Sequence, residues 1–163
     1  NQQLKLVLEN VRIDEIVESS INLVREQADE LGIVIDYNFS DITVKANKAR
    51  LEQVFTNLLT NAIKFNYKQG MVTVDVKNTD GNQVEVSIMD TGVGIAPEDS
   101  DKIFMPFTRL DYAQENEIRG VGIGLSQSKY LVEEMNGSID FHSEMGQGSV
   151  FSVRFPRVRN SQA

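Results

Sequence analysis

The chain has 163 residues, one histidine, no cysteine and a formal net charge of −8, from 24 acidic and 16 basic side chains. The absence of cysteine excludes a disulfide framework, a cysteine-ligated zinc site and thiol catalysis, and the single histidine argues against a His-based metal cage or a Ser-His-Asp triad. The length suits one domain, the acidic balance argues against nucleic acid as a partner, and the short apolar runs predict no membrane span or signal peptide.

The N-terminal part of the chain is predicted to contain two amphipathic helices and several strands. Apolar residues alternate over 4–8 and 33–39 and briefly over 42–44, which favours strands. Apolar residues at helical spacing predict helices over 14–31, with Asp14 as the N-cap, and over 47–65.

The C-terminal part continues the mixture of strands and helices. Asp80-Gly81 separates two alternating segments and predicts a hairpin, because both residues tolerate positive φ. The predicted elements are strands over 72–76, 84–88, 139–143 and 149–155, and helices over 97–103 and 122–136. Because hairpins rather than βαβ crossovers connect the strands, we expect a two-layer α/β sandwich. Its mixed, mainly antiparallel sheet would be covered by helices on one face.

A glycine-containing turn, Asp90-Thr-Gly92-Val-Gly94, follows the strand over 84–88. Strand alternation directs Asp90 toward the core, where a carboxylate is costly unless a hydrogen-bond donor meets it. The exocyclic amine of a purine base is such a donor, and the glycines allow the backbone to approach the ring. The alternative is an Asx turn, in which the carboxylate accepts from amides of its own loop.

A second glycine cluster, Gly120-Val-Gly122-Ile-Gly124, leads into the predicted helix over 122–136. Its backbone N–H groups can converge on an anion at a helix N-terminus. It is not a Rossmann fingerprint, because no strand precedes it, and it lacks the Lys-Ser/Thr of a Walker loop. The alternative is a flexible loop at a helix start.

The long helix over 47–65 carries Asn57, Asn61 and Lys64 on one stripe. At ~100° per residue, Asn61 lies ~40° from Asn57 and Lys64 lies ~20° to its other side. Amide oxygens suit Mg²⁺, which keeps waters and phosphate oxygens as its other ligands, and a lysine neutralises phosphate charge. The alternative is a solvated polar face.

Taken together, four motifs resemble one known domain. They closely resemble the N, G1, F and G2 boxes of the catalytic and ATP-binding domain of two-component sensor histidine kinases, a family shared with DNA gyrase, Hsp90 and MutL. The resemblance covers essentially the whole chain and implies a mixed five-stranded sheet backed by three helices, with a mobile ATP lid over 104–119. The four motifs are Asn57-x-x-x-Asn61-Ala-x-Lys64, Asp90-x-Gly92-x-Gly94, Phe104-Met-Pro-Phe107 and Gly120-x-Gly122-x-Gly124-Leu125.

The resemblance also implies roles for individual residues. Asp90 would bind the adenine amino group, with Ser149 helping through a water. Asn61 and Asn57 would hold Mg²⁺ at the phosphates that Lys64 reaches. The ATP-binding set that the resemblance implies is Asn57, Asn61, Lys64, Phe65, Asp90, Gly92, Gly94, Ile95, Arg109, Gly120, Val121, Gly122, Ile123, Gly124, Leu125 and Ser149.

No catalytic residue is assigned within this chain. ATP-hydrolysing relatives carry a Glu four residues before the metal Asn, but here that position is Asn57, which cannot accept a proton near neutral pH. Glu52 lies ~140° around the helix from Asn57 and is no substitute. His142 lies in a predicted strand and lacks the helical context of a phosphoacceptor. We therefore expect the chain to present the γ-phosphate of ATP to a histidine elsewhere.

The resemblance further implies partners and an organisation for the chain. We expect 1–10 to be a junction after dimerisation helices, 11–158 to be the ATP-binding domain and 159–163 to be a tail. The expected partners are the dimerisation and histidine-acceptor domain of the same kinase and the receiver domain of a response regulator. We expect a cytoplasmic domain with no direct membrane contact. Two alternatives are a non-catalytic nucleotide-binding regulatory module and an ATPase of the gyrase or Hsp90 type.

Overall fold

The computed structural model describes residues 5–38, 40–105 and 124–158. Their elements, in chain order, are β1 (Glu9–Arg12), α1 (Ile13–Glu30), β2 (Val34–Asn38), β3 (Thr43–Ala46), α2 (Lys48–Lys64), β4 (Met71–Thr79), β5 (Gln83–Asp90), the short 3₁₀ helix η1 (Pro97–Asp99), α4 (Gly124–Glu134), β6 (Ser138–Glu144) and β7 (Gly148–Pro156).

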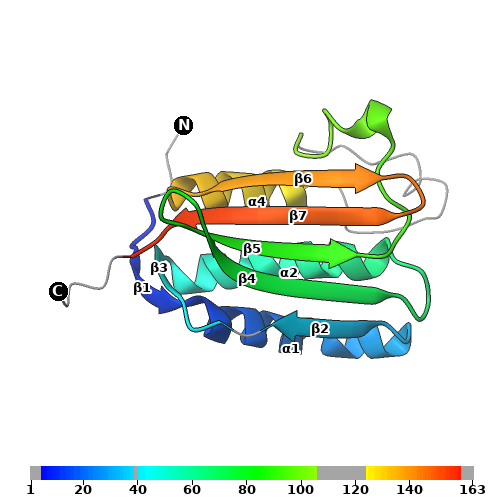
Figure 1. The fold of residues 1–163 in the computed structure, drawn as a ribbon, viewed down its shortest axis with the longest axis horizontal. Helices are drawn as coiled ribbons and strands as arrows, with labels where there is room; N and C mark the ends of the chain where they lie inside the picture. The colour runs from blue at the N-terminus through cyan, green and yellow to red at the C-terminus, as the bar shows by residue number, and fades with distance from the viewer. Residues whose placement is uncertain (1–4, 39, 106–123, 159–163) are drawn as a thin grey trace.

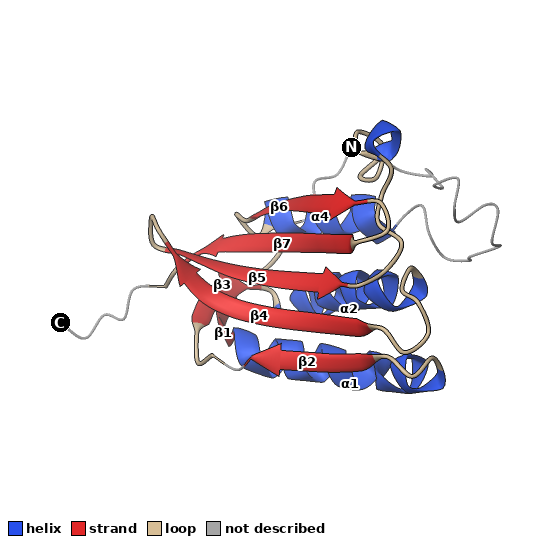
Figure 2. Cartoon of the chain, turned by 45° about the vertical axis from the view of Figure 1, so that its right-hand side comes forward, coloured by secondary structure: helices blue, strands red, loops and turns tan. Residues whose placement is uncertain are grey.

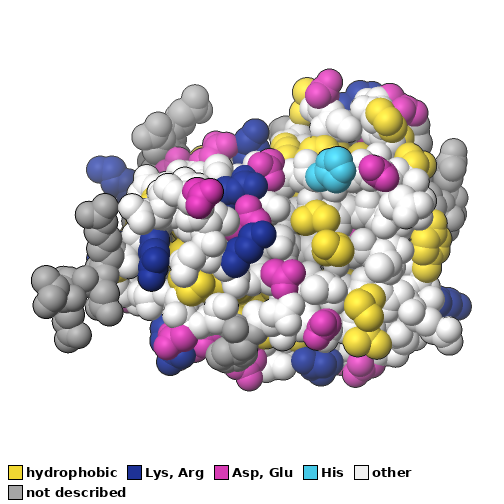
Figure 3. All heavy atoms as spheres, in the orientation of Figure 1, with side chains coloured by type: hydrophobic (Ala, Val, Ile, Leu, Met, Phe, Trp, Pro, Cys, Tyr) yellow, Lys and Arg dark blue, Asp and Glu magenta, His cyan; other side chains and the backbone are white. Residues whose placement is uncertain are grey.

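Five strands form one sheet in the order β2-β4-β5-β7-β6, and β1 pairs with β3 in a separate small sheet. Helices α1, α2 and α4 lie side by side behind the large sheet in Figure 1, and the turned view in Figure 2 shows the same two layers. The predicted fold class, a two-layer α/β sandwich with a mixed five-stranded sheet and helices on one face, is confirmed. The other face of the sheet presents charged, polar and some hydrophobic side chains (Figure 3).

One strand connection differs from the sequence-based expectation. Strands β2 and β4 pair in parallel, while every other neighbouring pair of the large sheet is antiparallel. The chain leaves β2, forms β3 and returns through α2 before it enters β4, so it crosses over a helix instead of reversing in a hairpin. Local alternation cannot reveal this pairing, because it depends on where α2 returns the chain.

The apolar patterns predicted for α2, β4 and β5 meet in the core. Leu51, Val54 and Leu58 of α2 are fully buried, and so are the alternating residues Val74 of β4 and Val86 of β5. Removing a side chain of this size from water contributes about 1.5–3 kcal/mol to folding. These contacts hold α2 against the middle of the sheet, and the end of α2 therefore reaches the loop that follows β5.

Two details at the N-terminal end correct the predicted elements. The expected strand over 4–8 is absent from the described residues 5–8, and β1 begins at Glu9 because its partner β3 covers only Glu9–Arg12. Asp14, predicted as an N-cap, lies inside the first turn of α1, where Arg12 contacts its carboxylate at 3.1 Å. The predicted start of α2 is confirmed, since the Asn47 side chain accepts a hydrogen bond from the Arg50 amide at 3.0 Å. Within the described part of the chain, no helix has the length and apolar character needed to cross a membrane.

Candidate functional site

Three polar side chains lie side by side at one end of the helix-covered face of the sheet. The strand register places Ser143 of β6 opposite Ser149 of β7, and Ser149 opposite Asp90 of β5. The next row on the same face is apolar, with Phe151 of β7 opposite Ile88 of β5. A row of polar groups at the edge of an apolar core requires hydrogen-bond partners, and a ligand can supply those that the protein does not.

Asp90 is the charged member of this row and is buried, with 6% of its surface exposed. Its Oδ1 accepts hydrogen bonds from the backbone N–H of Gly92 at 2.9 Å and of Ser149 at 3.3 Å. Burial raises the pKa of Asp90 to about 6, although these two hydrogen bonds partly oppose the shift. Within residues 5–38, 40–105 and 124–158, Oδ2 has no hydrogen-bond partner and no basic side chain pairs with the carboxylate.

Gly92 allows the loop after β5 to pass against the end of α2. A Cβ at Gly92 would lie 2.2 Å from the carbonyl oxygen of Phe65, so a larger residue cannot occupy this position without moving the backbone. The Val93 amide donates to the same carbonyl at 3.0 Å, and the Val93 carbonyl accepts from the Gly146 amide at 2.9 Å. The loop is thus held between the end of α2 and the β6–β7 turn.

The middle of α2 contacts the start of α4. Asn57 donates from Nδ2 to the hydroxyl of the buried Ser128 at 3.4 Å, which leaves its Oδ1 as an acceptor. Gly124 lies beside the Asn57 amide, since a Cβ there would be 3.8 Å from Asn57 Cγ. The structure therefore brings the first motif against the end of the last one. Asn61 follows one turn after Asn57, and Lys64 is the last residue of α2.

Several predicted site residues lie outside the described part of the chain. These are Arg109, Gly120, Val121, Gly122 and Ile123. Most of the predicted lid lies there as well.

Other members of the predicted set flank the site. The amide of Ile95 donates to the Ser143 hydroxyl at 2.7 Å, and Leu125 packs against the core from the first turn of α4. Phe104, at the start of the predicted lid, packs edge-on against Phe141 and Phe151, with ring centroids 5.9 and 6.3 Å away.

The structure adds two site residues that the sequence analysis did not assign, Ser143 and Ser128. Ser143 contacts Ser149, and Ser128 contacts Asn57. The register of β6 with β7 places Ser143 opposite Ser149, and the alternation within a single strand does not reveal this register. No local signal marks Ser128, since its contact depends on the packing of α4 against α2. His142 is exposed on the adjacent position of β6.

The donor set suits a magnesium ion bound together with phosphate. Among the described residues, no three or more His, Cys, Asp or Glu side chains gather into a metal-binding group. The amide oxygens of Asn57 and Asn61 are hard ligands of the kind Mg²⁺ accepts when phosphate oxygens and waters complete its shell. Asn57 fits this role because its amide nitrogen is engaged by Ser128 and its oxygen is left to accept.

Residues 46–159 match the family model described as histidine kinase-, DNA gyrase B- and HSP90-like ATPase. The chain is 33% identical over 163 residues to the non-motile and phage-resistance protein of Caulobacter vibrioides, covering 98% of this chain and 19% of that protein. It is 34% identical over 134 residues to the sensor protein SrrB of Staphylococcus aureus, covering 82% of this chain and 23% of that protein. The chain thus spans about a fifth of the length of these relatives.

A solved structure with the same fold contains a nucleotide analogue. Full-length ShkA in complex with AMPPNP superposes with a TM-score of 0.83 at 30% sequence identity, covering 98% of this chain and 33% of that chain. The shared fold therefore extends over nearly the whole of this chain.

Proposed function

The chain belongs to the family of histidine kinase-, DNA gyrase B- and HSP90-like ATPases, and on that premise we propose that it is the ATP-binding catalytic domain of a sensor histidine kinase. Membership of the family confirms the resemblance inferred from the four motifs. The observation that carries the proposal is the buried Asp90 carboxylate, one oxygen of which is held by backbone amides while the other lacks a partner among the described residues.

The Asp90 carboxylate selects for the base of the nucleotide. An adenine amino group offers an N–H to Oδ2, whereas guanine places a carbonyl oxygen at that position and would set two acceptors against each other. A mismatch of this kind leaves a buried acceptor unpaired and costs about 1–3 kcal/mol. The Gly92 loop allows the base to approach the backbone beside Asp90.

The phosphates of ATP are placed toward α2 and the start of α4. Gly124 begins α4, and Lys64 supplies a positive charge at the end of α2. The sequence resemblance implies that the backbone N–H groups of Gly120 and Gly122 would also contact the phosphates. Asn57 and Asn61 would hold Mg²⁺ through their amide oxygens. When bound, the ion neutralises charge on the phosphate oxygens and fixes their orientation.

Asn57 favours transfer of the γ-phosphate to an outside acceptor over hydrolysis of ATP. An amide cannot take a proton from water near neutral pH, so this chain holds the γ-phosphate without activating a nucleophile. The acceptor is then a histidine on the dimerisation domain of the same kinase, and the phosphoryl group passes to the receiver domain of a response regulator. We also propose that the domain lies in the cytoplasm, as its resemblance to sensor histidine kinases implies.

Thermal unfolding with and without Mg²⁺-ATP tests the nucleotide site. We expect ATP to raise the melting temperature of the chain and Asp90→Asn to abolish that increase, because ligand that binds only the folded state stabilises it. Asp36→Asn, the same substitution at an exposed position of β2, is the matched control and should keep the ATP effect. An ATP-induced increase that persists in Asp90→Asn would contradict the site.

Incubation with labelled ATP and the separately purified dimerisation domain of the parent protein tests the chemistry. We expect acid-labile label on the dimerisation domain and none on this chain alone. Nucleotide binding without transfer would instead support a regulatory module. Steady release of phosphate without an acceptor would support an ATPase of the gyrase or Hsp90 type.

A further inference from the structure

We propose that Ser143 is a positioning residue for base recognition: it fixes the Ser149 hydroxyl as a hydrogen-bond acceptor beside Asp90, and so makes the site selective for bases that present N–H donors. The inference rests on the proposed nucleotide site and names the feature that sets its base selectivity. Ser143 lies outside all four sequence motifs.

The Ser143 hydroxyl has three hydrogen-bond partners from two segments of the chain. The Ile95 amide lies 2.7 Å from Ser143 Oγ, the Gly148 carbonyl oxygen lies 3.0 Å away, and Ser149 Oγ lies 2.8 Å away. These segments are the loop after β5, which holds Ile95, and the start of β7, which holds Gly148 and Ser149, the latter opposite Ser143 in the sheet. One side chain thus joins the loop that carries Gly92 to the hairpin that carries Ser149.

Counting protons determines the direction of each bond. A serine hydroxyl has one proton and two acceptor positions. The Ile95 amide can only donate and the Gly148 carbonyl can only accept, so Ser143 uses its single proton on Gly148. The bond between the two hydroxyls then requires Ser149 to donate to Ser143. This is the assignment in which all three contacts are hydrogen bonds at once.

As a consequence, Ser149 and Asp90 both present hydrogen-bond acceptors to the ligand; we call these two side chains the floor of the site. With its proton directed at Ser143, Ser149 offers only lone pairs toward the site. Asp90, its cross-strand neighbour, offers Oδ2, which has no partner within the described residues. Two adjacent acceptors match an exocyclic amine, directly or through a water that donates to the floor. They oppose a base that places a carbonyl oxygen there.

Loss of the Ser143 hydroxyl should therefore change selectivity. In Ser143→Ala, Ser149 is released to rotate and can donate its proton to a ligand carbonyl. A structural role alone, holding the Ile95 loop, predicts a different result: the affinity for every nucleotide would fall by the same factor. The ratio of affinities separates the two roles.

Calorimetric titration with ATP and with inosine triphosphate, in the presence of Mg²⁺, tests the proposal. The two ligands share the ribose and phosphates, and inosine carries a carbonyl oxygen in place of the adenine amine. We expect wild type to prefer ATP and Ser143→Ala to lower the ATP-to-inosine triphosphate affinity ratio about three- to tenfold, the magnitude of one hydrogen bond. Ser143→Thr keeps the hydroxyl and should restore the wild-type ratio.

Two further variants keep the result decisive. Ser149→Ala removes the proposed acceptor and should also lower the ATP-to-inosine triphosphate affinity ratio. If Ser149 instead donates to the ligand, Ser149→Ala should raise this ratio. In the Ser149→Ala background, Ser143→Ala should leave the ratio unchanged. If Ser143→Ala does not fold, as judged by its melting curve without nucleotide, the affinity ratio of Ser149→Ala becomes the test: a lower ratio supports the inference and a higher ratio contradicts it.

The outcomes distinguish this inference from the proposed function. If wild type binds ATP but Ser143→Ala weakens both ligands equally, Ser143 only holds the loop and the inference is wrong. If wild type binds neither nucleotide, the proposed site itself is wrong and the inference falls with it. A lowered ratio that Ser143→Thr restores supports both.

Discussion

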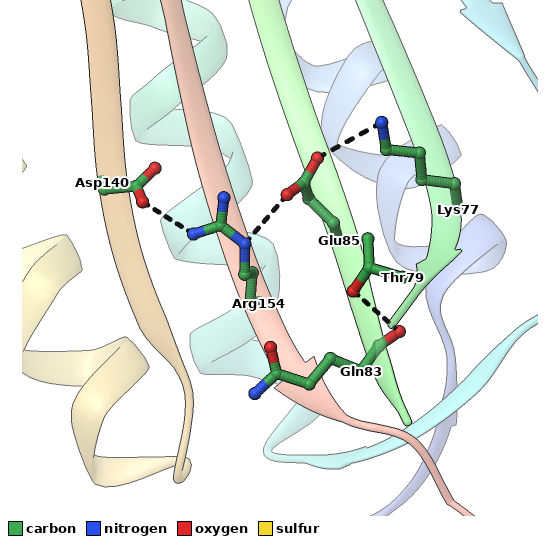
Figure 4. A network of polar contacts seen from close by, with 6 residues as sticks. All are labelled: Lys77, Thr79, Gln83, Glu85, Asp140 and Arg154. Carbon is green, nitrogen blue, oxygen red and sulfur yellow. Dashed lines mark hydrogen bonds and ion pairs between the residues drawn. The ribbon is translucent and has the colours of Figure 1, made fainter. Parts of the chain in front are cut away.

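Strand β5 carries two carboxylates that face opposite sides of the sheet and have opposite surroundings. Glu85 lies on the open face, where Arg154 Nε approaches it at 2.9 Å and Lys77 Nζ at 3.7 Å (Figure 4). Arg154 also contacts Asp140 at 2.7 Å, so four charges from four neighbouring strands form one network. Asp90 lies on the helix-covered face, where backbone amides contact one of its oxygens and no described cation pairs with it.

The difference between the two carboxylates separates stabilising charge from binding charge. The hydrogen bond to Asp140 and the charges of Asp140 and Glu85 raise the pKa of Arg154, so the two acids of the open-face network favour the charged form of Arg154. Asp90 is destabilised in its charged form, since burial raises its pKa to about 6. A group that is costly to keep charged and lacks a partner is typical of a functional site. The open-face network is typical of a surface.

Gly148→Ala should have the largest effect, because it disrupts the packing around Asp90. Gly148 has φ of +106°, and a Cβ there would lie 2.0 Å from the Asp90 carbonyl oxygen. Left-handed strain and overpacking together should lower the free energy of unfolding by about 2–5 kcal/mol and abolish ATP binding. Urea unfolding measures the first effect and calorimetry the second.

Gly146→Ala is the matched control for this substitution. Gly146 also has positive φ, +80°, but nothing lies within 4 Å of its Cβ position. Its substitution should therefore lower the free energy of unfolding by only about 1 kcal/mol, from backbone strain alone. Equal losses for the two variants would show that the close approach of β7 to Asp90 is not what the site requires.

Asp90→Asn should have an intermediate effect on the free energy of unfolding. We expect it to raise this free energy at pH 7.5, whereas Glu85→Gln should lower it. A folded pKa of about 6, above the usual 3.8, means that the folded state binds the proton more tightly. The stabilisation from protonation is present at low pH and is lost as the pH rises through about 6. Without nucleotide, Asp90→Asn should therefore unfold with a free energy about 1–2 kcal/mol above wild type at pH 7.5.

The pH dependence provides the control for this prediction. The advantage of Asp90→Asn should disappear near pH 4, where the wild-type carboxyl is already protonated. Glu85→Gln removes a paired carboxylate and should lower the free energy of unfolding at pH 7.5. Urea unfolding at the two pH values measures both variants. A loss of stability in Asp90→Asn at pH 7.5 would mean that the carboxylate is well solvated or paired, and the contrast between the two faces would fail.

Local patterns were enough to predict most elements of the fold. Alternation over β4 and β5, the turn at Asp80-Gly81 and the apolar stripe of α2 each depend on residues close in sequence, and all three predictions are confirmed. The parallel pairing of β2 with β4 was not predicted, because hairpin signals describe only adjacent strands. The strand expected over 4–8 failed for a related reason, since its partner β3 is too short to reach it.

Some residues of the site could likewise be predicted from local sequence patterns, whereas others depend on contacts between distant segments. Strand alternation correctly directed Asp90 toward the core, where it is buried opposite Ser149. Ser143 could not be recognised from composition or spacing, since its role depends on the register of β6 with β7 and on the loop after β5. Ser128 meets Asn57 only after α4 packs against α2. Residues that position other residues are visible only in three dimensions.

Lys77→Ala should have the smallest effect and tests the other side of the comparison. The Lys77 side chain is 62% exposed and its ion pair with Glu85 spans 3.7 Å, so solvent screens the attraction and we expect a change below about 0.5 kcal/mol. Urea unfolding should show that this small difference disappears in 1 M salt, where the screening length falls to about 3 Å. Lys68→Ala removes an exposed lysine that pairs with no described acid and serves as the control. ATP affinity should be unchanged in both variants. A loss of ATP binding in Lys77→Ala would mean that the two faces of β5 are coupled, and that the open-face charges belong to the binding site rather than to the surface.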